Sequence, residues 1–268
     1  MHRLLLPVVL VTALAVAQTP APSPPASTQS IPVDQQNATK ARALIDSAIQ
    51  ALGGQAYLDV RNISQEGRTY SFHLGTPNSV GVLFWRFYEY PDRERVEVTK
   101  QRDVAYVYNG DAGFEVTYKG AKSMEDKDLN DFLRRRAHSL DWVLRKWINE
   151  PGVAYFYEGT TVAAQKPAEQ VTILNTRNEG VTLYFDINTH LPIKKSFSWR
   201  DPADKQRNVE DEVWDNYRPV QGIMTPFSVS RYYNGDMSNQ RFLNSVTYNQ
   251  PLKETMFDVG IPNKPTNK

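Results

Sequence analysis

The stretch 84-FWRFYEYPDRERVEV-98 decides how the chain is interpreted. Its first half places large aromatic rings at successive positions, so a strand formed here carries rings on both faces. One face is expected to meet the helices that build the core. The other could meet a second layer of sheet, a partner, or an apolar ligand such as a lipid chain between sheet and helix.

Similar segments, rich in β-branched and aromatic residues, extend on both sides of this stretch and are separated by turn residues such as Asn109-Gly110 and Asn234-Gly235. Short turns without intervening helices predict antiparallel pairing. The predicted strands are Val60–Leu74, Val80–Tyr90, Arg95–Val98, Val104–Tyr108, Gly113–Tyr118, Val153–Tyr157, Gln170–Asn175, Val181–Asp186, Ile193–Trp199, Glu210–Tyr217, Met224–Tyr233, Arg241–Tyr248 and a short one near Phe257.

Helical spacing of apolar residues occurs twice. The first helix is predicted to start at a cap on Asn37 or Thr39 and to stop at Gly53-Gly54. Its apolar face consists of Ala41, Leu44, Ile45, Ala48 and Leu52. The second covers Leu129 to Trp147, as one long helix or as two joined near His138. The order of helix, strands, helix and strands predicts an α+β domain.

The N-terminus has the order of an export signal. A basic start is followed by an apolar run that is too short to span a bilayer and by Ala15-Val16-Ala17. We expect residues 1–17 to be removed, 18–38 to form a disordered leader rich in Pro, Ser and Thr, and 39–268 to form a single domain. Because the chain has no cysteine to carry a lipid, we expect a periplasmic protein without a lipid anchor.

Composition narrows the classes of function. Loss of Arg3 with the signal would bring the formal net charge from +1 to about zero, which argues against nucleic acid as a partner. Only His73, His138 and His190 would remain, and none has a second histidine at metal-ligand spacing. Nucleophile elbows and nucleotide-binding glycine loops are absent from the sequence. We therefore predict no catalytic residues, no metal and no cofactor.

Charged clusters are interpreted as ordinary solvated surface. The acidic group Glu125 to Asp128 begins a helix, where carboxylates are favoured. Glu210 and Glu212 share one face of a strand, and a hydrolase using them is the least favoured alternative. Arg134 to Arg136 could bind phosphate, but a solvated helix face is the preferred interpretation.

Several turn patterns resemble those of the periplasmic lipoprotein carriers and receptors of the LolA/LolB superfamily. In Tyr90–Glu97 a strand ends at proline and the next opens with arginine. Val181–Pro192 is similar to the recurrent strand with an Asp-x-x-Thr-x-x-Pro turn, and Tyr217–Pro226 to a strand start with Gly, an apolar pair and Pro. Asn249–Pro262 resembles the closing Asn, Phe and Pro pattern.

The resemblance implies a curved antiparallel sheet, an incomplete β-barrel of about eleven strands, covered by helices. It also implies a non-enzymatic binding or carrier protein whose concave face shelters an acyl chain or lipoprotein lipid. The alternative is a cell-envelope interaction or scaffold protein that has an envelope partner and fills its core with its own side chains. For the carrier, the predicted ligand-lining residues are Phe84, Trp85, Phe87, Phe114, Trp142, Trp147 and Phe185.

Overall fold

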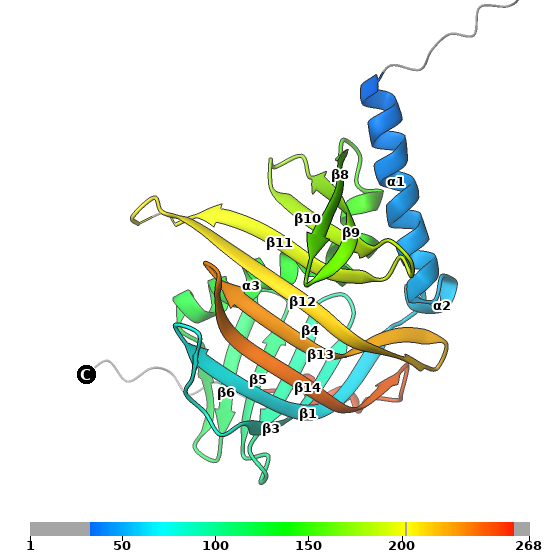
Figure 1. The fold of residues 1–268 in the computed structure, drawn as a ribbon. Helices are drawn as coiled ribbons and strands as arrows, with labels where there is room; N and C mark the ends of the chain where they lie inside the picture. Colours follow the sequence, from blue (N-terminus) through cyan, green and yellow to red (C-terminus); the bar gives the residue numbers. More distant parts are fainter. Residues whose placement is uncertain (1–32, 202, 260–268) are drawn as a thin grey trace, which may run out of the picture. The chain divides into compact units, whose positions relative to one another are not determined.

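The computed structural model describes residues 33–201 and 203–259. They form one antiparallel sheet in the order β7-β6-β5-β4-β3-β1-β14-β13-β12-β11-β10-β9-β8, with β2 beside β1 (Figure 1). The strands are β1 Asn62–His73, β2 Thr76–Pro77, β3 Val82–Glu89, β4 Arg93–Val98, β5 Val104–Asn109, β6 Ala112–Thr117, β7 Gly120–Ser123, β8 Ala154–Ala163, β9 Lys166–Leu174, β10 Gly180–Asp186, β11 Pro192–Arg200, β12 Arg207–Val220, β13 Ile223–Tyr233 and β14 Asp236–Tyr248.

This architecture confirms the predicted α+β fold, a curved and open sheet with few helices. The predicted number of about eleven strands is too low, since the sheet has fourteen. Two short strands, β2 and β7, were not predicted because two to four residues give too little alternation to recognise. The strand expected near Phe257 is instead a 3-10 helix, η2 Glu254–Phe257.

Helix α1, Val33–Leu52, is longer than predicted. It starts before Asn37, so residues 33–38 of the predicted leader are helical, while the predicted signal and residues 18–32 lie outside the described residues. Asn37 does not cap the helix. Its side-chain amide donates to the carbonyl of Tyr157 at 2.8 Å and accepts from the amide of the same residue at 2.8 Å, which fixes α1 to β8.

The second helical region consists of separate pieces, so the predicted join near His138 is correct. They are α3 Asp126–Ala137, α4 Leu140–Arg145 and the 3-10 helix η1 Trp147–Asn149; a short α2, Gln55–Leu58, follows α1. Ser139 starts α4, because its hydroxyl accepts a hydrogen bond from the amide of Trp142 at 3.3 Å. No helix among the described residues is long and apolar enough to cross a membrane.

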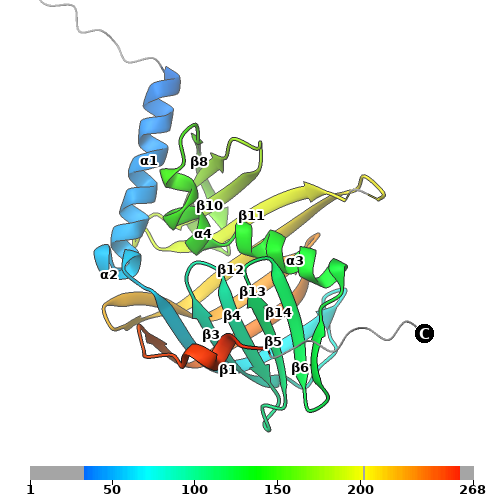
Figure 2. The ribbon, with the colours of Figure 1, turned by 180° about the vertical axis from the view of Figure 1, so that it is seen from behind.

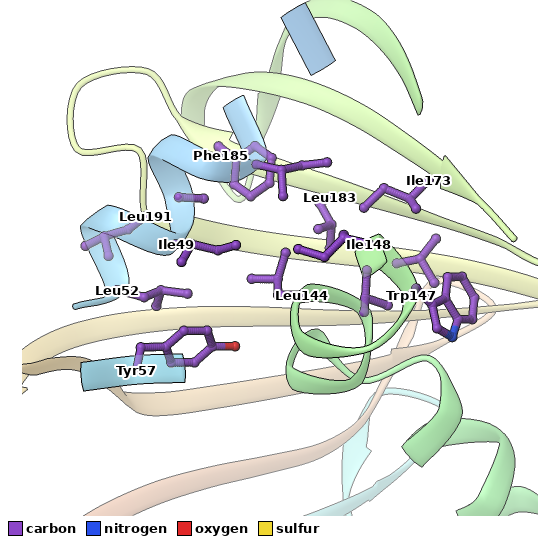
Figure 3. Close-up of a cluster of buried hydrophobic side chains, with 14 of the residues drawn as sticks. Ile49, Leu52, Tyr57, Leu144, Trp147, Ile148, Ile173, Leu183, Phe185 and Leu191 are labelled. Atoms are coloured by element: carbon purple, nitrogen blue, oxygen red, sulfur yellow. The ribbon is translucent and has the colours of Figure 1, made fainter. Parts of the chain in front are cut away.

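The main core lies between the helices α1, α4 and η1 and the strands β9–β11, and it extends to residues of β1, β3, β13 and β14. The predicted apolar face of α1 is confirmed, with Ala41, Ile45 and Ala48 inaccessible to solvent. Figure 3 shows side chains from α1, α4 and η1 meeting those of the strands. Trp147 and Phe185 are completely buried in this cluster, which therefore fills the space between sheet and helices.

Candidate ligand-binding site

The concave face is not filled everywhere. Under α3 and the start of α4, two neighbouring cavities of about 500 and about 190 Å³ open against the sheet. They share the lining residues Arg86, Ser139, Asp141, Glu212 and Arg241 and so lie next to each other. The larger volume lies in the range of small-molecule binding pockets.

One wall of the larger cavity is apolar. It is formed by side chains of β3, β4 and β5 on the sheet and by one ring of α3. These residues are Phe84, Val96, Val98, Tyr106, Tyr108 and Phe132. In register, Phe84 lies opposite Val98 and Val96 lies opposite Tyr106, so the wall is a continuous patch across three strands.

The opposite wall is charged. The sheet register places Lys195 of β11 opposite Glu212 of β12, Glu212 opposite Arg231 of β13, and Arg231 opposite Asn239 of β14. All four side chains line the larger cavity. Because directly opposed residues point to the same face, these strands present one polar row to the ligand space.

Glu212 holds the centre of this row. Its carboxylate accepts a hydrogen bond from Arg241 at 3.2 Å and forms an ion pair with Lys195 at 3.2 Å. Burial alone would raise the pKa of Glu212, but Lys195, Arg231 and Arg241 lower it to about 2. Lys195, only 2% exposed, also donates to the carbonyl of His138 at 2.9 Å and so links the row to the end of α3.

A second ion pair lies between the two walls. Arg86 of β3 donates two hydrogen bonds to Glu94 of β4, at 2.7 and 3.1 Å. A third goes to Gln65 of β1 at 3.3 Å. The bidentate geometry fixes the orientation of the guanidinium relative to the carboxylate, so this pair is a well-ordered part of the cavity lining.

Helix α3 covers the cavity without a buried residue of its own. The ring of Phe132 stacks on Tyr108, with centroids 3.4 Å apart. Arg136 donates to the carbonyl of Gly110 at 2.7 Å. Gly113 allows the helix to approach, since a Cβ there would lie 2.9 Å from Leu129 Cδ1. Figure 2 shows α3 running past one end of β5 and β6.

Tyrosines surround an acid in the smaller cavity. The hydroxyl of Tyr57 donates to Asp141 at 2.8 Å. Burial raises the pKa of Tyr57 and Tyr90 well above the usual range, and the negative charge of Asp141 adds to both shifts. The phenols therefore stay protonated and act as hydrogen-bond donors or acceptors rather than as bases.

The seven predicted ligand-lining residues are not brought together. Phe84 lines the larger cavity. Trp147 and Phe185 belong to the filled core, and Trp142 packs against that core from a half-buried position. Trp85 and Phe87 lie beneath the guanidinium of Arg102, 4.9 and 5.9 Å from the ring centroids. Phe114 pairs in register with Val107, whose side chain packs in the separate cluster around Phe257.

The prediction that the charged clusters are ordinary solvated surface is wrong for several residues of the cavity. Glu210 and Glu212 share a face as expected, but they are not solvated; Glu210 is 4% exposed and both line the cavity. Arg135 and Arg136 also face the cavity rather than open solvent. Each of these strands has charged residues near its middle or end, but they become a row only once the register is known.

Among the described residues there is no group of three or more His, Cys, Asp and Glu side chains that could hold a metal ion. The acidic residues of the cavity have basic or phenolic partners, as Glu94 has in Arg86 and Asp141 in Tyr57. The arrangement is that of a lidded pocket with one apolar and one charged wall.

An open, curved antiparallel sheet with a helix over its concave face defines the class of half-barrel folds. No family model matches the sequence, and no curated protein matches it either. Solved structures do match. A DUF1329 family protein from Desulfovibrio piger has a TM-score of 0.58 at 10% identity, covering 81% of this chain and 97% of that one.

Two further matches identify the particular fold. A LolA superfamily protein from Nitrosomonas europaea has a TM-score of 0.50 at 11% identity, covering 81% of this chain and 96% of that one. A putative outer membrane lipoprotein-sorting protein domain from Vibrio parahaemolyticus has a TM-score of 0.52 at 9% identity, covering 83% and 97%. This chain therefore has a LolA-like fold, which confirms the resemblance deduced from its turn patterns.

Proposed function

We propose that this protein is a periplasmic, non-enzymatic binding or carrier protein that shelters a hydrophobic ligand, such as an acyl chain or lipoprotein lipid, under α3. The observation that carries the proposal is the cavity of about 500 Å³ with an apolar wall beneath a helix that has no buried residue. An empty apolar wall loses contacts that a ligand would restore. The similarity of the fold to a putative outer membrane lipoprotein-sorting protein domain supports this use of the cavity.

The direct test is native mass spectrometry of the protein purified from its own periplasm, followed by solvent extraction and lipid analysis. A lipid or acylated peptide that co-purifies at one molecule per chain supports the proposal and identifies the class of cargo. An apoprotein that also fails to bind a fluorescent fatty acid contradicts it and leaves the scaffold alternative, in which a pull-down recovers a stable envelope protein without extractable lipid.

A matched pair of variants locates the site. Phe84 and Phe87 belong to the same strand, but only Phe84 lines the cavity. Phe84→Asn should weaken uptake of the fluorescent fatty acid about tenfold, whereas Phe87→Asn should leave it unchanged. Phe132→Asn, in the half-buried lid, provides a second variant that does not depend on the sheet core. Equal effects of the two strand variants would place the ligand elsewhere.

A further inference from the structure

The cavity contains more positive than negative charge. Six basic side chains line it, namely Arg86, Arg135, Arg136, Lys195, Arg231 and Arg241. Four acidic ones oppose them, namely Glu94, Asp141, Glu210 and Glu212. Half-buried charges are costly without partners, so a surplus of cations that face the cavity requires an explanation.

The surplus of positive charge lies at two of the six basic side chains. Glu94 is neutralised by Arg86, and Glu212 is shared by Lys195 and Arg241. Arg136 forms an ion pair with Asp111 at 3.1 Å and donates to the backbone carbonyls of Asp92 and Gly110. The two basic residues that remain are Arg135 on the lid and Arg231 on the sheet.

Arg135 and Arg231 both act on the carboxylate of Glu210. Within the part of the chain that the structure describes, the side chain of Arg135 forms no hydrogen bond and no ion pair, although the charges of Glu210 and Asp131 act on it. Arg231 approaches Glu210 only at 3.6 Å, and its buried Nε has no hydrogen-bond partner there. Glu210 thus satisfies neither guanidinium.

The electrostatics agree with this geometry. Burial lowers the pKa of Arg135, and the positive charge of Arg231 lowers it further. The same two causes act on Arg241. Burial raises the pKa of Glu210, which weakens it as a counter-ion. A ligand anion placed between the guanidinium groups would relieve this mutual repulsion.

We infer that the cavity selects acidic amphiphiles, with an anionic head group between Arg135 and Arg231 and an apolar tail against the wall of β3–β5. This inference rests on the proposed function and adds to it the charge of the ligand. A carboxylate and a phosphate monoester share the required chemistry, since both accept paired hydrogen bonds from guanidinium. The head group lies at the charged wall and the tail lies on the apolar wall, since the lining of the cavity is divided between these two walls.

The experiment compares probes that share one acyl chain. Displacement of a fluorescent fatty acid is measured with oleic acid, methyl oleate, oleoyl lysophosphatidic acid and inorganic phosphate. We expect at least one of the two acidic lipids to bind about tenfold more tightly than the ester, because its charged head group accepts hydrogen bonds from guanidinium that the ester cannot match. The stronger of the two acids identifies the head group as carboxylate or phosphate.

Neighbouring arginines on α3 supply the control. Arg135→Gln should weaken the acid about tenfold and leave the ester unchanged, whereas Arg134→Gln should change neither, since Arg134 lies over the ring of Trp199 at 4.0 Å. Glu210→Gln removes the competing carboxylate and should tighten binding of the acid severalfold. A gain in affinity of this kind cannot arise from misfolding.

Two results overturn the inference while the sheltering function stands. One is equal affinity for acid and ester, and the other is an equal effect of Arg135→Gln and Arg134→Gln. Displacement by inorganic phosphate alone would show a free-anion site and also overturn it. If neither the fluorescent fatty acid nor any of the oleoyl probes binds, the proposed function fails and this inference fails with it.

Discussion

Under α1 and α4 the concave face of β9–β11 meets a solid apolar layer, whereas under α3 the same face of β3–β5 and β12–β14 borders an open cavity. One line of directly opposed residues, which runs across the strands, passes from the filled region to the region of the cavity. Its opposed residues, from β9 to β14, are Val171, Leu183, Lys195, Glu212, Arg231 and Asn239. The side chains change from aliphatic to charged where the covering helix changes.

The covering helices explain the difference. Helix α1 presents five buried residues to the strands, and α4 adds Val143 and Leu144. Helix α3 buries none and has three consecutive arginines in its last turn. A helix that brings no apolar stripe cannot close a core, so the space below it remains available. The filled region thus supports the fold, and the open region is where we propose that a ligand binds.

The largest expected effect comes from truncating one phenylalanine in the filled region. Phe185→Ala removes a completely buried ring and should lower the free energy of unfolding by about 3–5 kcal/mol. Phe132→Ala removes a half-buried ring from the lid and should cost no more than about 1–2 kcal/mol, because its stack on Tyr108 is its main contact. Urea unfolding followed by circular dichroism measures both. Equal losses would contradict the division into two regions.

The boundary row should respond to pH. Glu212→Gln leaves Lys195 and Arg241 without their carboxylate and should cost about 3 kcal/mol at pH 7. The pKa of the Glu212 carboxyl is about 2 in the folded protein and 4.5 in the unfolded chain. Its contribution to stability is therefore fully present above pH 4.5 and is lost as pH falls through about 2. The stability gap between wild type and variant, measured at pH 7 and pH 3, should therefore shrink. A gap that stays constant would show that packing, not charge, is lost.

The sequence predicts best those features whose pattern lies within a single helix, strand or turn. The apolar face of α1, the Gly53-Gly54 stop and the break before Ser139 are local patterns, and the structure has all three features. The antiparallel sheet followed from short turns. These features depend on periodicity and capping, which a single sequence displays directly.

The site could not be predicted in the same way. Aromatic residues predict burial, but they do not distinguish a core such as that around Trp147 from a cavity wall such as Phe84. Charged residues such as Glu210 and Arg135 are usually solvated, and their burial here depends on which strands pair and where the lid lies. Register and helix placement are tertiary properties, so the charged wall was visible only in the folded chain.

A smaller difference is expected between the free energies of local opening of the two covering helices α3 and α1, which hydrogen exchange measures. Amides in the middle of α3 should exchange by local opening at about 1–2 kcal/mol less than amides in the middle of α1, because α3 has no buried side chain to lose. Exchange followed by NMR or mass spectrometry gives the opening free energies. Equal protection of α3 and α1 would mean that α3 is a fixed wall, and a ligand would then need another route into the cavity.

The smallest expected effect lies at the joint between the regions. Ser139 lines both cavities and caps α4 through its hydroxyl, which accepts from the amide of Trp142. Ser139→Ala removes this bond and should cost about 1 kcal/mol, whereas Ser139→Asp keeps an acceptor and should cost less. Thermal unfolding of both variants measures the difference. Since α4 is anchored by Val143 and Leu144, the loss should leave the protection of α4 nearly unchanged and increase exchange in α3. Increased exchange in α4 instead would show that the filled region depends on the cap, and that the two regions are less independent than their packing indicates.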